Sequence, residues 1–171
     1  FEQGAAAYEK PRVAVIVPAW DETTCIQCNR CSYVCPHATI RPFALSEEEV
    51  ANAPAGLQTA KMIGKGLEEY RFTMAVSPMD CMGCGVCVGE CPAKEKALKM
   101  KEAVKVERKN VDMIFDTVKN KNILPKTTIK GSQFEKPLFE FSGACAGCGE
   151  TPYARLITQL FGDRMVIANA T

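Results

Sequence analysis

Short runs of apolar and β-branched residues predict four strands in the first hundred residues. They lie at residues 12–17, 39–43, 71–76 and 97–100, and each is too short for a typical helix. A cysteine-rich segment separates the first two strands, and another separates the last two. The chain therefore repeats the order strand, cysteine-rich loop, short helix, strand. Two such halves predict an α+β fold with pseudo-twofold symmetry.

Between the two halves lies an insertion, residues 46–70. It opens with Ser46 followed by Glu49 three positions later, which is the signature of a capping box at the start of a helix. We expect one or two helices in it, the second weakened by Gly64 and Gly66. A structural cover over a metal site is the expected role of this insertion.

The pattern changes after the second half. Residues 104–120 predict an amphipathic helix, and residues 120–137, with their Lys, Pro, Gly and Ser content, predict a linker. Residues 151–161 predict a further helix, with Thr151 as its N-cap, Pro152 at its first position and Gly162 at its end. Its apolar residues Tyr153, Leu156, Ile157, Leu160 and Phe161 share one face. The expected divisions are 1–119, 120–137 and 138–171, the last being the start of a new domain.

Charge and hydropathy exclude several classes of protein. Lys and Arg number 21 against 20 Asp and Glu, so no strong field would attract nucleic acid or an anionic membrane. The longest apolar run, residues 13–20, contains Pro18 and is far shorter than a bilayer span. The chain begins with Phe1 and shows no export signal, so we expect a piece of a larger cytoplasmic protein.

Eight of the ten cysteines form two copies of the pattern C-x2-C-x2-C-x3-C-P. The copies consist of Cys25, Cys28, Cys31 and Cys35, and of Cys81, Cys84, Cys87 and Cys91. A 4Fe-4S cube needs four converging thiolates, and in two-cluster ferredoxins the fourth cysteine of each run ligates the other cluster. This predicts one cluster on Cys25, Cys28, Cys31 and Cys91, and a second on Cys81, Cys84, Cys87 and Cys35.

Zinc is the main alternative metal, because paired C-x2-C units also build zinc ribbons. It would leave the third and fourth cysteines of each run without a role. Gly83, Gly85 and Gly89 fit a cluster further, since they allow the backbone to approach the cube and to direct N–H groups at its sulfurs. The sequence thus predicts a bacterial-type ferredoxin fold with two 4Fe-4S clusters and a helical insertion.

Cys145 and Cys148 form one more C-x2-C pair. By itself this pair fits a redox dithiol, half of a zinc site or half of a cluster site. Its surroundings, residues 143–153 and 167–171, closely resemble the opening of the thiamine-diphosphate domain of pyruvate:ferredoxin (flavodoxin) oxidoreductases. Residues 24–100, including His37 after Pro36, are similar to the cluster domain of the same family.

This resemblance implies the beginning of an α/β thiamine-diphosphate-binding domain at residues 138–171. It implies that Cys145 and Cys148 supply two ligands of a third 4Fe-4S cluster, whose other ligands would lie beyond Thr171. Glu150 matches a position that contacts thiamine diphosphate, held with Mg2+ in the full enzyme. A simpler reading of Glu150 is an acid that complements the helix dipole.

The family oxidatively decarboxylates pyruvate with coenzyme A, giving acetyl-CoA and CO2, and passes electrons to ferredoxin or flavodoxin. By resemblance, this chain is the electron-transfer segment, it carries no catalytic residue that we can identify, and its partners are the remainder of the enzyme, the acceptor and a second copy in a homodimer. Alternatives are a pyruvate:NADP oxidoreductase, a separate two-cluster ferredoxin and a zinc-stabilised binding module.

Three further features have simple explanations. His37 is expected to pack or face solvent, because four thiolates already complete each cluster, and Trp20 is expected to cover a cluster. A basic stretch follows the second cysteine run; it comprises Lys94, Lys96, Lys99, Lys101, Lys105, Arg108 and Lys109. With Glu95, Glu102 and Glu107 interleaved, it is typical of a solvated face. Our hypothesis is that part of it steers an acidic ferredoxin.

Overall fold

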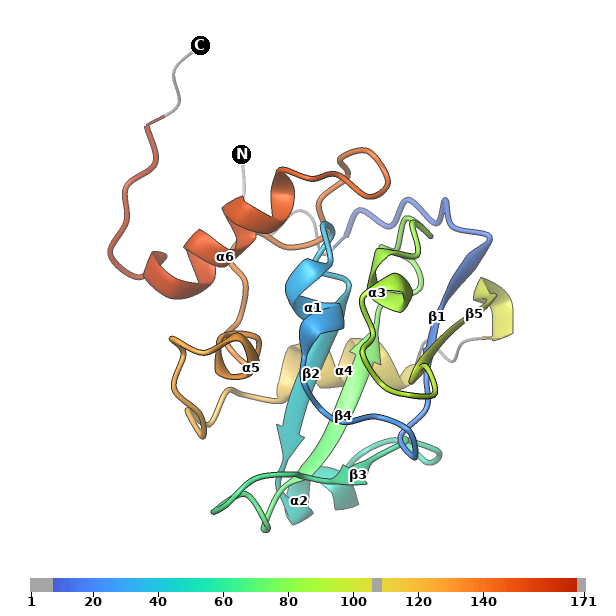
Figure 1. The fold of residues 1–171 in the computed structure, drawn as a ribbon, viewed down its shortest axis with the longest axis vertical. Helices are drawn as coiled ribbons and strands as arrows, with labels where there is room; N and C mark the ends of the chain where they lie inside the picture. Colours follow the sequence, from blue (N-terminus) through green and yellow to red (C-terminus); the bar gives the residue numbers. More distant parts are fainter. Residues whose placement is uncertain (1–7, 106–108, 169–171) are drawn as a thin grey trace.

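A computed structural model of the chain describes residues 8–105 and 109–168 (Figure 1). The predictions made for Phe1, Glu107, Arg108 and residues 169–171 lie outside the described residues. Helices cover both sides of a small antiparallel sheet, and a separate two-stranded ribbon lies beside it. No helix in the described part of the chain is long and apolar enough to cross a membrane.

The strands of the two halves pair with one another. β1 (Ile16–Trp20), from the first half, pairs antiparallel with β5 (Leu98–Glu102), from the second. β2 (Ile40–Leu45) pairs antiparallel with β4 (Arg71–Val76), to which the two-residue strand β3 (Ala60–Lys61) also pairs. Each half therefore completes its sheet with the other half, so neither is expected to fold alone. The predicted alternation of strand, cysteine loop, helix and strand is confirmed.

The main core lies between the strands and the cysteine loops. Phe72 is fully buried at its centre, with Trp20 edge-on at 5.7 Å and Phe134 edge-on at 6.4 Å between ring centroids. Trp20 comes from β1, Phe72 from β4 and Phe134 from a much later segment. The aromatic contacts thus join three distant parts of the chain beneath the cysteines.

The insertion holds one helix, α2 (Glu47–Ala51), and its capping box is confirmed. The Ser46 hydroxyl accepts the Glu49 N–H at 3.2 Å, and the Glu49 carboxylate accepts the Ser46 N–H at 2.7 Å. The rest of the insertion runs back along β4: the Thr73 hydroxyl donates to the carbonyl of Gln58 at 2.8 Å. The possible second helix of the insertion, which the structure describes throughout, does not form. The backbone instead adds strand β3 to the edge of the sheet, next to β4.

Helix α4 (Lys109–Thr117) covers the far face of the three-stranded sheet (Figure 1). Its Val111 and Ile114 are buried against Phe43, Leu45 and Ala75. The predicted amphipathic helix therefore exists, but its expected start was wrong. Val104 lies earlier, in the 3-10 turn η2 (Ala103–Lys105), and is 91% exposed.

The stretch 120–137, expected from its composition to be a linker, contains helix α5 (Ile129–Ser132) and packs against the first half. Thr128 caps α5 by accepting the N–H of Gly131 at 3.0 Å. Gln133 and Phe134 are buried. The Asn29 amide donates to the carbonyl of Lys130 at 2.9 Å. A polar residue of this stretch thus caps α5, and a backbone carbonyl of the stretch accepts a hydrogen bond from the first half of the chain.

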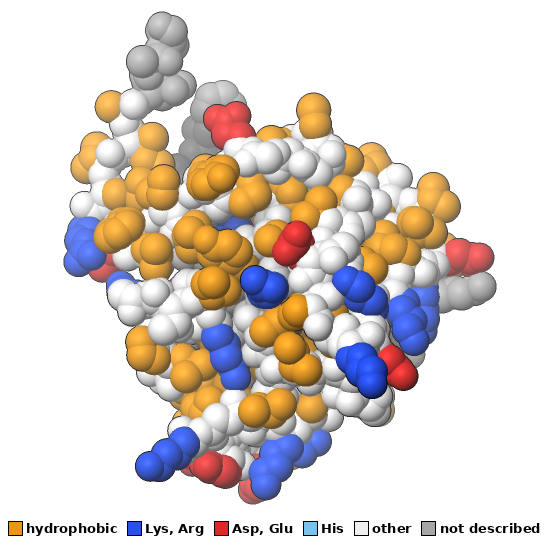
Figure 2. Space-filling view, in the orientation of Figure 1, with side chains coloured by type: hydrophobic (Ala, Val, Ile, Leu, Met, Phe, Trp, Pro, Cys, Tyr) orange, Lys and Arg blue, Asp and Glu red, His pale blue; other side chains and the backbone are white. Residues whose placement is uncertain are grey.

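Helix α6 (Thr151–Phe161) lies along one side of the molecule and ends at Gly162, as predicted. Its N-cap is Glu150; the expectation of Thr151 was wrong, because the Thr151 hydroxyl donates instead to the carbonyl of Pro36. Part of the apolar face is turned outwards: Tyr153, Ile157 and Phe161 are exposed, and Figure 2 shows apolar side chains gathered over this helix. Polar Arg155 and Gln159 form the buried face.

Candidate metal centres

Two cavities in the fold are each lined by four cysteines. The first cavity contains Cys25, Cys28, Cys31 and Cys91, with Trp20, Met74 and Leu98 among its apolar walls. The second cavity contains Cys35, Cys81, Cys84 and Cys87. The structure thus brings together the same two crossed sets of four that were predicted, each with one cysteine from the opposite half; ligation itself stays a prediction.

Two short helices distribute the cysteines between the cavities. In α1 (Arg30–Val34), Cys31 faces the first cavity, while Cys35, at the C-cap, faces the second. In α3 (Val86–Gly89), Cys87 faces the second cavity and Cys91, beyond the end, faces the first. The helices α1 and α3 pack side by side. The segment of each helix therefore contributes one thiol to each cavity.

The loops that precede these helices use left-handed backbone conformations. In the second half, Gly83 and Gly85 have φ of 69° and 75°, and a Cβ on Gly83 would lie 3.0 Å from the Ile16 carbonyl oxygen. These two glycines fit the role predicted for them. Gly89 has no positive φ and belongs to α3. The N–H of Gly83 points at the Cys81 sulfur at 3.4 Å.

The first half achieves the same backbone shape without glycine. When Cys25 is aligned with Cys81, Gln27 and Asn29 fall on the positions of Gly83 and Gly85, and they have φ of 55° and 59°. The Gln27 amide donates to the carbonyl of Lys61 at 2.8 Å and accepts the N–H of Ile63 at 2.8 Å. These bonds offset the strain of the left-handed conformation. Sequence reasoning missed both residues, although the internal repeat placed them opposite glycines.

Burial raises the pKa of four of the cysteines in these cavities. Desolvation raises the pKa of Cys81 to about 11 and that of Cys87 to about 12, and it also raises the pKa of Cys25 and Cys31. Without a metal these groups are neutral thiols. A bound metal centre would hold them as thiolates and release their protons.

The donor set fits an iron–sulfur cluster. Each cavity presents four thiols, the number of thiolates that a 4Fe-4S cube requires. Among the described residues, no group of three or more His, Cys, Asp or Glu side chains has the geometry to hold one metal ion. Backbone N–H groups aimed at sulfur, such as that of Gln27 at 3.4 Å from Cys25, would stabilise the negative charge of the cluster.

The third cysteine pair lies next to the second cavity. Cys145 is exposed and Cys148 is partly buried, and the Cys148 N–H donates to the Cys145 carbonyl at 2.9 Å. A Cβ on Gly147, between them, would lie 3.6 Å from the Cβ of Cys84. The N–H groups of Thr151 and then Glu150 lower the pKa of Cys148. The pair therefore lies close to a cysteine of the second cavity, and its partly buried member, Cys148, has a lowered pKa.

Glu150, His37 and Trp20 occupy definite positions around these sites. Glu150 is exposed at the N-cap of α6 and makes no side-chain capping bond. His37 is buried, lines the second cavity, and donates from Nδ1 to the Ser142 carbonyl at 2.7 Å. Its expected packing role is confirmed. Trp20 lines the first cavity, as predicted for an apolar cover.

The fold and the two cysteine-lined cavities define a ferredoxin-type 4Fe-4S domain of mixed helix and strand, and residues 24–95 match the family model described as 4Fe-4S dicluster domain. Over its entire length the chain is also similar to one segment of the pyruvate:flavodoxin and pyruvate:ferredoxin oxidoreductases. It is 55% identical to the pyruvate-flavodoxin oxidoreductase of Klebsiella pneumoniae and 52% identical to the pyruvate:ferredoxin oxidoreductase of Moorella thermoacetica.

A related enzyme with another acceptor in its name matches almost as well. The chain is 48% identical to the mitochondrial pyruvate dehydrogenase [NADP(+)] of Euglena gracilis. All three matches cover 100% of this chain, but only 15%, 15% and 10% of the respective relatives. The chain thus corresponds to a small part of each relative.

Proposed function

We propose that this chain is the electron-transfer segment of an enzyme that oxidatively decarboxylates pyruvate with coenzyme A, giving acetyl-CoA and CO2, and delivers the electrons to ferredoxin or flavodoxin. The observation that carries the proposal is the pair of four-cysteine cavities within a chain that is 55% identical, throughout, to part of a pyruvate-flavodoxin oxidoreductase. When bound, 4Fe-4S clusters would accept and donate single electrons.

In this proposal each cavity holds one cluster. Cys25, Cys28, Cys31 and Cys91 ligate the first, and Cys35, Cys81, Cys84 and Cys87 ligate the second. The exchange of Cys35 and Cys91 between the halves supports this assignment, because α1 and α3 each end between the two cavities. Cluster binding would then link both halves of the domain.

Cys145 and Cys148 supply two ligands of a third cluster in the proposed enzyme, and other parts of the full protein complete it. The lowered pKa of Cys148 supports the role of a thiolate ligand. Glu150 contacts thiamine diphosphate, which the full protein holds with Mg2+, and residues 138–171 begin that domain. The exposed position of Glu150 leaves its carboxylate available for such a contact.

The positions of the cysteines suggest a direction for the electrons. The 145–148 loop borders Cys84, so electrons pass from the third site to the second cavity and then to the first. Residues of the basic stretch follow Cys91 and offer the acceptor a docking side. We include a homodimer, a cytoplasmic location and the division 1–119, 120–137 and 138–171 in the proposal.

Pyruvate:NADP oxidoreductase is a second candidate, favoured by the 48% identity to the Euglena gracilis relative. A separate two-cluster ferredoxin is less well supported, because the similarity to the large enzymes continues past residue 119 to the end of the chain. The acceptor separates the two enzyme candidates. The full-length protein should reduce flavodoxin or ferredoxin, and not NADP, when supplied with pyruvate and coenzyme A.

Anaerobic purification tests the metal content directly. We expect about eight irons and eight inorganic sulfides from the two cavities of this chain, together with the brown colour of 4Fe-4S clusters. A colourless protein that contains stoichiometric zinc would refute the proposal. Pyruvate-dependent reduction of the clusters in the full-length protein, followed by electron paramagnetic resonance, tests the enzyme assignment separately.

A further inference from the structure

Arg155 is a buried cation at the end of the helix that joins the two cavities. It is 1% exposed, and it reaches from α6 to the last carbonyls of α1. Its Nη1 donates to the Ser32 carbonyl at 2.6 Å and to the Gln133 side-chain oxygen at 3.2 Å, and its Nη2 donates to the Tyr33 carbonyl. Cys35 follows two residues after Tyr33. A fixed positive charge therefore lies beside the segment that carries a thiol of the second cavity.

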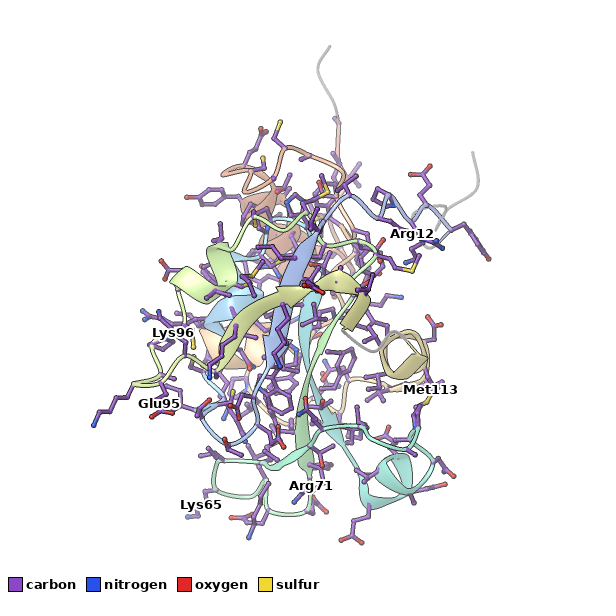
Figure 3. The ribbon with its side chains drawn as sticks, turned by 90° about the vertical axis from the view of Figure 1, so that its right-hand side faces the viewer. Arg12, Lys65, Arg71, Glu95, Lys96 and Met113 are labelled. Atoms are coloured by element: carbon purple, nitrogen blue, oxygen red, sulfur yellow. The ribbon has the colours of Figure 1, made fainter. Side chains whose placement is uncertain are left out.

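The internal repeat provides an equivalent cation in the other half. Alignment of Cys25 with Cys81 places Tyr33 opposite Gly89 and Cys35 opposite Cys91. Lys96 donates from Nζ to the Gly89 carbonyl at 2.9 Å and to the Cys91 carbonyl at 2.7 Å. Both helices therefore end on a bound cation, as the helix dipole favours. Lys96, however, is exposed at the edge of the molecule (Figure 3), whereas Arg155 is enclosed.

The segment that carries Arg155 also holds the chain on both sides of Cys35. The Thr151 hydroxyl donates to the Pro36 carbonyl at 2.7 Å, and His37 binds the Ser142 carbonyl. Together with the Arg155 bonds, these contacts fix residues 32–37 against the segment of the third cysteine pair. Arg155 is thus held in place and cannot swing into solvent.

We propose that the buried charge of Arg155 raises the reduction potential of the cluster held by Cys35, Cys81, Cys84 and Cys87. The inference rests on the proposed function. Reduction adds one electron to the cluster, and a permanent positive charge nearby stabilises the added negative charge, most strongly where water is excluded. Lys96 acts on the other cluster in the same sense but more weakly, because solvent screens an exposed charge.

A guanidinium is suited to this role. Burial lowers the pKa of Arg155, but an arginine remains protonated throughout the physiological range. Its planar fork can also bind two successive carbonyls at once, which the ammonium of a lysine does less rigidly. Arg155→Lys therefore keeps the charge and changes the hydrogen-bonding geometry, whereas Arg155→Met removes the charge.

The test is a redox titration of the full-length protein, purified anaerobically and followed by electron paramagnetic resonance. The spectrum of Cys84→Ser, compared with that of the wild type, shows which signal belongs to the second-cavity cluster. We expect Arg155→Met to lower the reduced-to-oxidised ratio of this cluster about tenfold at a fixed poise, equivalent to about 59 mV for one electron. Arg155→Lys should retain most of the wild-type potential. Lys96→Met should shift only the other cluster, and by less.

Gln133→Glu provides a second variant if Arg155→Met does not retain its clusters. It places a carboxylate against Arg155 with nearly unchanged shape, so it should lower the same potential. The inference is overturned if the clusters are present and neither Arg155→Met nor Gln133→Glu moves this potential. A wild-type protein without cluster signals would instead refute the proposed function, so the two failures are distinguishable.

Discussion

Cys31 and Cys35 lie at opposite ends of helix α1 and face different cavities. Cys31 belongs with Cys25 and Cys28 around the first cavity, while Cys35 belongs with the cysteines of the second half. The same relationship recurs for Cys87 and Cys91 at α3. One helix of a few residues therefore links the two proposed metal centres, so removing either cysteine should affect one particular cluster.

Replacing Cys35 with serine should impair the cluster of the opposite half. We expect loss of about four irons from the second cavity, with the first cavity still loaded, and the reverse for Cys91→Ser. Iron analysis and electron paramagnetic resonance of the purified variants measure this. Cys145→Ser is the matched control, because it should leave both cavities loaded. Loss of the first-cavity cluster in Cys35→Ser, with the second intact, would contradict the crossed assignment.

Alkaline pH should destabilise the metal-free protein. The folded chain holds the pKa of Cys81 at about 11 and that of Cys87 at about 12, against an ordinary value of 9.0. Between about pH 9 and 12 the folded state binds more protons than the unfolded state, so the free energy of unfolding falls as pH rises. The contribution of these two neutral thiols to the free energy of unfolding is fully present below pH 9 and is lost as the pH rises through their raised pKa values.

Far-ultraviolet circular dichroism of the metal-free chain across this pH range measures the effect. The double variant Cys81→Ala/Cys87→Ala should lose much of the pH dependence. The cluster-loaded protein should also lack it, because its cysteines are already thiolates bound to iron. An equal pH dependence in the metal-free and loaded proteins would show that thiol burial is not its cause.

Local patterns predicted the strands well where the sequence marks both ends. The strand at residues 71–76 matches β4, since polar and proline residues follow its apolar run. The strand expected at residues 12–17 is β1, Ile16–Trp20, shifted towards the C-terminus. Pro18 appeared to break this run, yet it is tolerated because β1 has only one partner strand and needs no donor on its free side.

The cysteine groups could be predicted because the repeated spacing is that of two-cluster ferredoxins, in which the fourth cysteine of each run belongs to the other cluster, whereas the position of Arg155 could not. An arginine on an amphipathic helix is normally solvated, and two of the three partners of Arg155 are backbone carbonyls, which have no sequence signature. The orientation of α6 could not be read from its pattern either. Tyr153, Ile157 and Phe161 on its apolar face are exposed, while the polar Arg155 and Gln159 are buried.

Breaking the ion pair between Arg41 and Glu140 should destabilise the protein. Arg41 is buried, with its guanidinium 2.9 Å from the Glu140 carboxylate and over the rings of Phe43 and Phe115. Desolvation lowers the pKa of Arg41 and raises that of Glu140, so burial outweighs the attraction for both partners. Glu140→Gln leaves a buried charge unpaired and should cost roughly 3 kcal/mol.

The double variant Arg41→Met/Glu140→Met is the informative comparison for this pair. It removes both charges and should be considerably more stable than Glu140→Gln, because no charge remains without a partner. Denaturant unfolding under anaerobic conditions measures both variants. If the double variant were the less stable of the two, the pair would be a net source of stability.

The basic stretch after Cys91 supplies the last prediction. Lys94 is exposed near the first cavity, whereas Lys96 is bound to the carbonyls of Gly89 and Cys91, so only Lys94 gives a clean test of steering. Lys94→Glu should slow association with an acidic ferredoxin a few-fold at low salt, and the difference should vanish at high salt. Lys119→Glu, an exposed lysine just after α4 on the far face of the three-stranded sheet, is the matched control. An unchanged dependence of the rate on ionic strength in Lys94→Glu would exclude steering by this residue.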